Sequence, residues 1–212
     1  MSATGDKIFA ATKTLILDFD GTLVDSNPIK WQAFEKCFAG YPYFEAIMAY
    51  CRENNHAPRR IKFRHVFENI LKQSYTEETE KKLLDQYAAE TTQQVIDAPE
   101  IPGAQKFLET FALNRLSILL SSTPHDVLEF ILKKRGMEKY FKVVQGAPVD
   151  KAAWLRQFFA DRKLGKGDAL FLGDSEEDAR SAEEAGIPFI SVGPHRRSPA
   201  LLHLENFLAL CD

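Results

Sequence analysis

Short apolar runs recur along the chain, and each leads into a stretch with helical periodicity. The runs contain few polar residues, which is typical of strands that are covered on both faces in a parallel sheet. Alternation of such strands with helices indicates the α/β class, and we predict a doubly wound parallel sheet. The predicted strands are residues 14–19, 116–121, 141–146, 169–174 and 188–193.

The segment between the first two predicted strands has a different pattern. Apolar residues recur there at helical spacing, without runs of the same strand-like quality. Two prolines and a glycine in APEIPG, residues 98–103, mark the end of this segment. We therefore predict a helical domain at residues 26–98, inserted into a core domain of residues 1–25 and 99–212. The clearest helical series is Phe63, Val66, Phe67, Ile70 and Leu71.

Composition narrows the classes of protein to consider. The 212 residues are 45% hydrophobic and 27% charged, with a net charge of -3, which is ordinary for a globular protein and does not indicate a nucleic-acid or membrane partner. No signal peptide and no apolar stretch of membrane-spanning length is apparent. The three cysteines, Cys37, Cys51 and Cys211, are too few and too widely spaced for a disulfide framework or a zinc site. We predict a cytoplasmic protein.

Polar residues with chemical potential follow four of the predicted strands. In open parallel sheets, ligands bind beyond the carboxyl ends of the strands, near the point where strand order reverses. We therefore expect these residues to gather at one edge of the sheet. They are Asp18 and Asp20, Ser121 and Ser122, Asp150 and Lys151, and Asp174 and Asp178.

The four strand-end aspartates would repel one another in such a pocket. Two carboxylates about 4 Å apart repel by roughly 4 kcal/mol at an effective dielectric constant near 20. A hard divalent cation would relieve this repulsion, and Mg²⁺ prefers carboxylate and carbonyl oxygens completed by water and a substrate phosphate. We therefore predict a Mg²⁺ site. Lys151 adds a fixed positive charge and Ser121 a hydroxyl donor, and both suit phosphate oxygens.

These groups can carry out phosphoryl transfer. The reaction needs an in-line nucleophile, neutralisation of developing charge and a proton for the leaving oxygen. Asp18, at the end of its strand, is the predicted nucleophile and would form an aspartyl phosphate. Asp20 would protonate the leaving alkoxide and later deprotonate the attacking water.

Four stretches of the sequence resemble the motifs of the haloacid dehalogenase superfamily, in the usual order. They are DFDGT at 18–22, LLSST at 119–123, Lys151, and GDSEED at 173–178. The resemblance implies a Rossmann-like core, the roles given above for Asp18 and Asp20, and Ser121 as the hydroxyl residue of the second motif. It also implies a metal held by Asp18, the backbone carbonyl of Asp20 and the fourth-motif acids, which map to Asp174 and Asp178.

The resemblance extends to the inserted segment. SNPIKWQAF at 26–34 and RRIKF at 59–63 look like a subgroup of phosphoglycolate phosphatase-like enzymes, which implies that the insertion is a helical cap. Ser122 stands where relatives commonly have asparagine, and we predict that it contacts the substrate. The implied function is hydrolysis of a small phosphomonoester, either a phosphorylated sugar or a phosphoglycolate-like acid.

Several residues have a structural interpretation as well. Lys151 could be a solvated lysine at a helix start, and Ser175 could simply cap the following helix. The basic cluster Arg59, Arg60, Lys62 and Arg64 could be a solvated face, or Arg59 and Lys62 could bind a substrate anion. Trp31, Phe34 and Phe38, at helical spacing, are expected in a core.

Two other functions remain open at this point. A phosphomutase of the same superfamily would use the same motifs and return the phosphoryl group to its product. A catalytically idle binding or regulatory protein on the same fold would have no use for the repelling carboxylates. The physiological substrate, the oligomeric state and any protein partners do not follow from the sequence.

Overall fold

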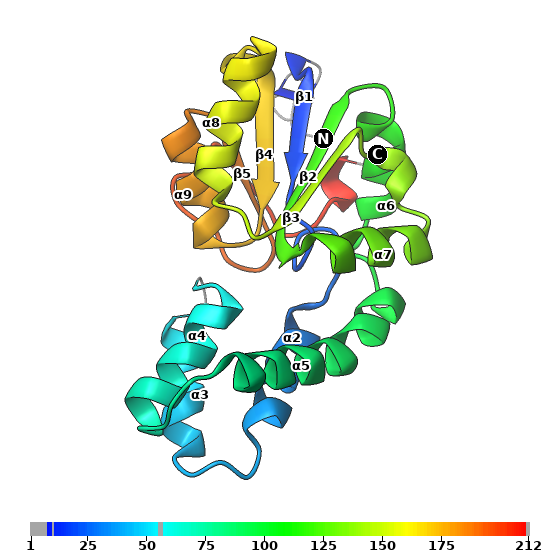
Figure 1. Cartoon of the computed structure of the whole chain (residues 1–212). Coiled ribbons are helices and arrows are strands. Elements are labelled where there is room, and N and C mark those ends of the chain that lie inside the picture. The colour runs from blue at the N-terminus through cyan, green and yellow to red at the C-terminus, as the bar shows by residue number, and fades with distance from the viewer. Residues whose placement is uncertain (1–7, 10, 55–56, 211–212) are drawn as a thin grey trace. The chain divides into compact units, whose positions relative to one another are not determined.

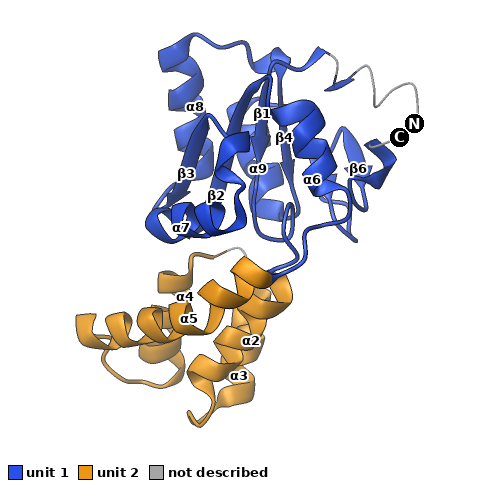
Figure 2. Cartoon of the chain, turned by 90° about the vertical axis from the view of Figure 1, so that its right-hand side faces the viewer, with its two compact units in different colours: residues 1–26, 98–212 blue, residues 27–97 orange. Residues whose placement is uncertain are grey.

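The computed structural model describes residues 8–9, 11–54 and 57–210. The chain divides into two compact units, one of Met1–Ser26 and Ala98–Asp212 and the other of Asn27–Asp97 (Figure 2). Each boundary lies one residue from the one expected from the sequence. No helix within the described ranges is long and apolar enough to cross a membrane.

The first unit is built on a six-stranded sheet in which every neighbouring pair is parallel. The strand order is β3-β2-β1-β4-β5-β6, so the chain leaves β1 toward one edge and then returns to build the other (Figure 1). This confirms the predicted doubly wound sheet. The strands are β1 (Thr14–Leu17), β2 (Leu116–Pro124), β3 (Val143–Ala147), β4 (Ala169–Gly173), β5 (Phe189–Val192) and β6 (Leu202–Leu204).

The sixth strand was not predicted, because three residues are too few to show a hydrophobic period. Its pairing with β5 joins Ile190 to Leu202 and Val192 to Leu204. Strand β6 therefore depends on its neighbour and not on a strong pattern of its own.

One face of the sheet is covered by α8 (Lys151–Arg162) and α9 (Glu176–Ala185), which lie on the same side of the strands in Figure 1. Alternate residues of the strands point to this face, as the two-residue period of a strand requires. Together with the two helices they form a buried hydrophobic core. Its residues are Ile16, Ile118, Leu120, Leu155, Phe158, Phe159, Ala169, Phe171, Ala179, Ala182, Ala185, Ile187 and Phe189.

The remaining helical segments of this unit include α6 (Ala104–Phe107), which continues as a π-helical turn (Leu108–Ala112), and α7 (His125–Arg135). The Phe107 ring packs on the rings of Phe9, Phe111 and Phe207, with centroids 5.5, 5.2 and 4.7 Å away. The described part of this unit also contains three short 3₁₀ helices, Glu138–Tyr140, Lys166–Asp168 and Leu208–Leu210.

The two chain segments that lead into and out of the insertion pair with each other within the first unit. Val24 and Glu100 form an antiparallel bridge. The Asp25 amide donates to the Pro99 carbonyl at 2.9 Å, and the Ile101 amide donates to the Leu23 carbonyl at 2.9 Å. Because the chain leaves and returns at adjacent points, the insertion does not interrupt the sheet.

The second unit contains α2 (Asn27–Phe38), α3 (Phe44–Glu53), α4 (Arg59–His65), a π-helical turn (Val66–Ile70) and α5 (Glu77–Asp97). Its core is aromatic: the Phe34 ring meets Phe63 and Tyr87 edge to face, with centroids 5.5 and 5.2 Å apart. Phe38 is also buried and Trp31 packs against this core, so the prediction for these side chains is confirmed.

The cysteines of this unit, Cys37 and Cys51, are buried and free. The third cysteine, Cys211, lies outside the described residues.

Candidate active site

Asp18 directly follows β1, the strand beside which the strand order reverses. Its amide donates to the Leu172 carbonyl at 3.0 Å, which continues the pairing of β1 with β4 by one residue. Asp18 is only 5% exposed. Strand pairing therefore fixes the backbone of this residue, as expected for a group that must be held in place to react.

Lys151 is the first residue of α8, and its ammonium group bridges two carboxylates. Its Nζ atom lies 2.9 Å from Asp18 Oδ1 and 2.7 Å from Asp178 Oδ1. Asp150 caps the helix by accepting the Ala153 amide at 2.8 Å, which sets the direction of this first turn. Lys151 is 3% exposed, so the alternative of a solvated lysine is wrong.

The charges of this triad change the acidity of its members. Burial lowers the pKa of Lys151, but the Asp178 and Asp18 carboxylates outweigh burial and hold that pKa above its usual range. Burial raises the pKa of the Asp18 carboxyl well above its ordinary value; Lys151 opposes this rise, and Asp178 and Asp174 add to it. The single lysine thus does not balance the negative charge around Asp18.

Asp178 is placed by the first turn of α9. Ser175 accepts the Asp178 amide at 3.1 Å and the Ser175 amide donates to Asp178 Oδ2 at 3.2 Å, which is a capping box. Gly173 allows this approach, because a Cβ atom there would lie 2.5 Å from the Cβ of Asp178. The GDSEED motif is therefore a helix start and part of the site at once.

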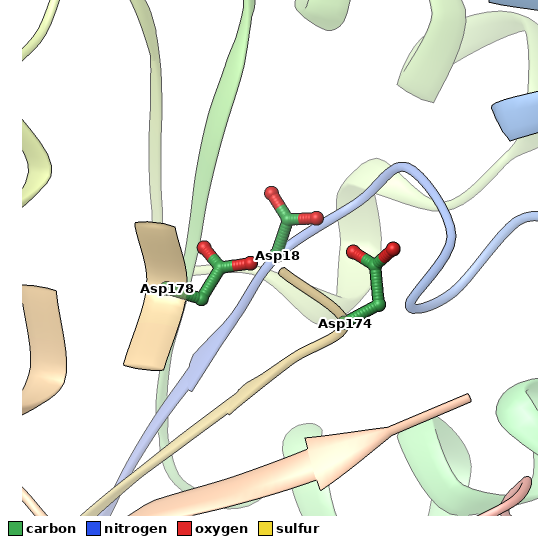
Figure 3. A group of neighbouring side chains, drawn as sticks. All are labelled: Asp18, Asp174 and Asp178. Atoms are coloured by element: carbon green, nitrogen blue, oxygen red, sulfur yellow. The ribbon is translucent and has the colours of Figure 1, made fainter. Parts of the chain in front are cut away.

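The three side chains that the resemblance assigns to the metal lie close together. Asp18, Asp174 and Asp178 each place one carboxylate oxygen within 4.8 Å of the others, and Figure 3 shows their carboxylate groups close together. Thr22 Oγ1 lies 3.4 Å from both Asp18 Oδ2 and Asp174 Oδ1. Oxygen donors around an excess of negative charge are what a hard divalent cation requires, so these residues fit such an ion.

The Asp20 side chain lies outside this group of three among the described residues, and the resemblance assigns only the backbone carbonyl of Asp20 to the metal. Its carboxylate accepts hydrogen bonds from Ser26 Oγ at 2.6 Å, Thr123 Oγ1 at 2.7 Å and Ser121 Oγ at 3.4 Å. The chain turns after Asp20 at Gly21, whose φ of 78° suits glycine. Hydroxyl groups of two β2 residues, and of Ser26 in the segment that follows Asp20, thus hold the Asp20 carboxylate apart from the other three.

The two adjacent serines of β2 point in different directions. Ser121 is buried and lies beside Asp20, whereas Ser122 is exposed and its Oγ lies 3.4 Å from Glu177 Oε2. The period of two along a strand explains the difference. Burial raises the pKa of Glu177, which Lys151 opposes.

Sequence reasoning missed four residues at this site: Thr22, Ser26, Thr123 and Glu177. The first two lie within the stretch DFDGTLVDS, and Thr123 follows the predicted serines directly. A hydroxyl residue within a few positions of a strand-end acid was the available signal. The contact of Ser122 with Glu177 joins residues 55 positions apart and has no local signal.

Arg59 and Lys62 lie on α4 in the second unit. They are the two residues of the basic cluster that could bind a substrate anion if the cluster is not a solvated face. The Arg59 guanidinium carbon lies 3.7 Å from the centroid of the Tyr87 ring, and Lys62 Nζ lies 4.5 Å from that of Phe34. Lys62 is 4% exposed, and burial lowers its pKa to about 8. The interpretation of the whole basic cluster as a solvated face is therefore wrong for Lys62.

Comparisons with known proteins identify the family of this chain. A family model for haloacid dehalogenase-like hydrolases matches residues 15–192. Phosphoglycolate phosphatase from Yersinia pestis is 28% identical over 192 residues, covering 87% of this chain and 82% of that protein.

Two solved structures share the fold. The structure of CbbY from Rhodobacter sphaeroides in complex with phosphate aligns with a TM-score of 0.74 at 16% identity, covering 94% of this chain and 96% of that one. The HAD-hydrolase YfnB from Bacillus subtilis, bound to magnesium, aligns with a TM-score of 0.73 at 16% identity and the same coverage. The predicted family is confirmed by the family model and the predicted fold by these structures: the chain belongs to the haloacid dehalogenase-like hydrolases.

Proposed function

We propose that this protein is a Mg²⁺-dependent phosphatase that hydrolyses a small phosphomonoester through an aspartyl phosphate on Asp18. The observation that carries the proposal is the buried Lys151, whose ammonium group bridges Asp18 and Asp178. A third carboxylate, that of Asp174, lies next to them. A relative that is 28% identical is named phosphoglycolate phosphatase. The cytoplasmic location stays a prediction from the sequence.

Asp18, Asp174 and Asp178 are the side chains that would hold the cation, and the Asp20 carbonyl would add a further oxygen. The structure of YfnB is described as bound to magnesium. Mg²⁺ in this position would neutralise the repulsion among the carboxylates and the charge that develops on the phosphoryl oxygens.

Asp18 and Asp20 divide the chemistry between them. A carboxylate oxygen of Asp18 attacks phosphorus as the bond to the leaving alkoxide breaks, and Asp20 gives that alkoxide its proton. In the second step Asp20 takes a proton from water, the water oxygen bonds to phosphorus, and the acyl phosphate bond breaks to release inorganic phosphate and Asp18. Hydrogen bonds from Ser26 and Thr123 hold the Asp20 carboxylate for this role.

Five further residues are proposed to act on the substrate. Lys151 and Ser121 would donate to phosphoryl oxygens, and Ser122, which is exposed at the end of β2, would contact the substrate beyond the phosphate. Arg59 and Lys62 stay predicted contacts for a second anionic group, such as the carboxylate of a phosphoglycolate-like acid. With a pKa of about 8, Lys62 is mostly protonated at neutral pH.

The first test is release of inorganic phosphate from a generic aryl phosphate, with Mg²⁺ and with the metal removed by a chelator. We expect turnover that stops on chelation and returns when Mg²⁺ is restored. A panel of phosphorylated sugars and phosphorylated small acids then ranks substrates by kcat/KM.

Two results would contradict the proposal. Interconversion of sugar phosphates without net phosphate release would indicate a phosphomutase. Absence of turnover with every phosphomonoester in the panel would indicate an idle binding protein on this fold.

A further inference from the structure

The loop that follows β5 reaches the backbone of Asp174. Arg197 donates from its Nε atom to the Asp174 carbonyl oxygen at 2.9 Å, and its Nη1 atom lies 3.7 Å from Glu176 Oε1. Strands β4 and β5 are hydrogen-bonded neighbours. Arg197 therefore ties together the loops that leave the carboxyl ends of two adjacent strands.

The backbone of Arg197 is hydrogen-bonded to Ser191, a residue of β5. Its amide donates to Ser191 Oγ at 2.9 Å, and the Ser191 hydroxyl lies 3.3 Å from the His195 carbonyl oxygen. Ser191 is fully buried, and the Nδ1 atom of His203, on β6, lies 3.4 Å from Ser191 Oγ. The arginine thus starts from a backbone position that the sheet fixes, and its side chain is 31% exposed.

The bond to the Asp174 carbonyl bears on the carboxylate because both belong to one residue. Asp174 lies one position beyond β4, where the strand ladder no longer holds it. A hydrogen bond to its carbonyl fixes the ψ angle of Asp174 and so restricts where the Cβ and the carboxylate can lie. The partners that orient a metal-binding group contribute to metal affinity nearly as the ligands do.

We propose that Arg197 is a positioning residue that holds Asp174 in the geometry needed for the divalent cation. This inference rests on the proposed function, because it assumes that Asp174 binds that cation. Arg197 donates to the backbone of a predicted ligand and belongs to none of the four family motifs in the sequence.

The sign of the effect separates positioning from simple charge. Arg197 carries a positive charge close to a site for a cation, so Coulomb repulsion alone predicts that removing this charge strengthens Mg²⁺ binding. Loss of positioning predicts weaker binding instead. Arg197→Lys keeps the charge and loses the planar guanidinium that serves Asp174 and Glu176 together, so it isolates the positioning effect at constant charge.

The experiment measures Mg²⁺ binding to the purified full chain by isothermal titration calorimetry. We expect Arg197→Met to weaken Mg²⁺ binding about 10-fold or more, and we expect Arg197→Lys, which keeps the opposing charge, to weaken it as well. In activity assays the Mg²⁺ concentration for half-maximal rate should rise in parallel, while kcat at saturating Mg²⁺ recovers. Arg196→Met is the matched control, because Arg196 is exposed, precedes Arg197 directly and donates to the Ala200 carbonyl at 2.6 Å.

The outcomes are distinct. Arg197→Met that binds Mg²⁺ as tightly as the wild type, or a loss of equal size in Arg196→Met, would overturn the positioning role alone. A wild-type protein that binds no Mg²⁺ would overturn the metal part of the proposed function together with this inference. If Arg197→Met fails to fold, the charge-conserving Arg197→Lys decides the question.

Discussion

The two units of this protein each contain a buried lysine, and the two lysines differ in what surrounds them. Lys151 is 3% exposed and its ammonium group lies between the carboxylates of Asp18 and Asp178. Lys62 is 4% exposed and its ammonium group lies over the Phe34 and Trp31 rings. Burial alone would lower the pKa of both.

The pKa values of the two lysines move in opposite directions. Carboxylates raise the pKa of Lys151 in spite of its burial, whereas burial lowers the pKa of Lys62 to about 8. Attraction to aromatic faces contributes about 0.5–2 kcal/mol and does not offset the loss of water around Lys62. Anionic partners therefore raise the pKa of a buried lysine above its usual range, and aromatic rings do not.

Removal of the carboxylate that Lys151 shares with the proposed chemistry should have the largest effect. We expect Asp18→Asn to lower kcat by at least about 10³-fold, because an amide oxygen cannot replace the nucleophile. The measurement is the initial rate of phosphate release at saturating substrate and Mg²⁺. Asp25→Asn is the control, since Asp25 is exposed in the same loop. A rate near that of the wild type in Asp18→Asn would show that another group attacks phosphorus.

A matched pair of substitutions compares the two lysines directly. Lys151→Met leaves two buried carboxylates without their cation, so we expect the free energy of unfolding to fall by about 3–5 kcal/mol. Lys62→Met replaces a buried charge by an apolar side chain of similar length, so we expect a change under about 1.5 kcal/mol, of either sign. Urea unfolding in the presence of a chelator measures both.

Equal losses in the two variants would mean that packing, and not charge, determines the contribution of each lysine. Addition of Mg²⁺ should restore part of the stability of Lys151→Met, because a cation would again offset the carboxylate charge.

The smallest expected effect is a difference in how stability depends on pH. The folded-state pKa of Lys62, about 8, lies below the value of about 10.4 for an unfolded chain. Between these two values the unfolded chain holds a proton that the folded protein has lost, so the Lys62 contribution to stability rises with pH by roughly 3 kcal/mol. Between pH 8 and 10.5, the free energy of unfolding of the wild type should therefore rise relative to that of Lys62→Met, as measured by urea unfolding curves.

Lys151 should show the opposite dependence. Its folded-state pKa is raised, so its contribution to stability is complete below the unfolded pKa and is lost only as the pH rises through the folded pKa. A Lys62 contribution that stays constant between pH 8 and 10.5 would show that the lysine remains charged among the rings.

Much of the fold was predictable because its signals are local. The apolar runs that form β1 to β5 show in any window of several residues, and the change of pattern after β1 marks the inserted helices. β6 was missed because Leu202–Leu204 is paired only by virtue of its neighbour. The Thr123 hydroxyl that donates to Asp20 was missed because Thr123 comes from another strand, 103 positions away.

The amino-acid sequence alone specifies which chemical groups stand at the strand ends and in what order, since each motif is a short run whose residues are neighbours along the chain. Which of these groups face each other depends on the tertiary structure. The Lys151 bridge to Asp18 spans 133 positions, and its geometry follows from the strand order. The separation of Asp20 from the other three aspartates and the burial of Lys62 depend in the same way on packing, because contact free energy depends on distance in space and not along the chain.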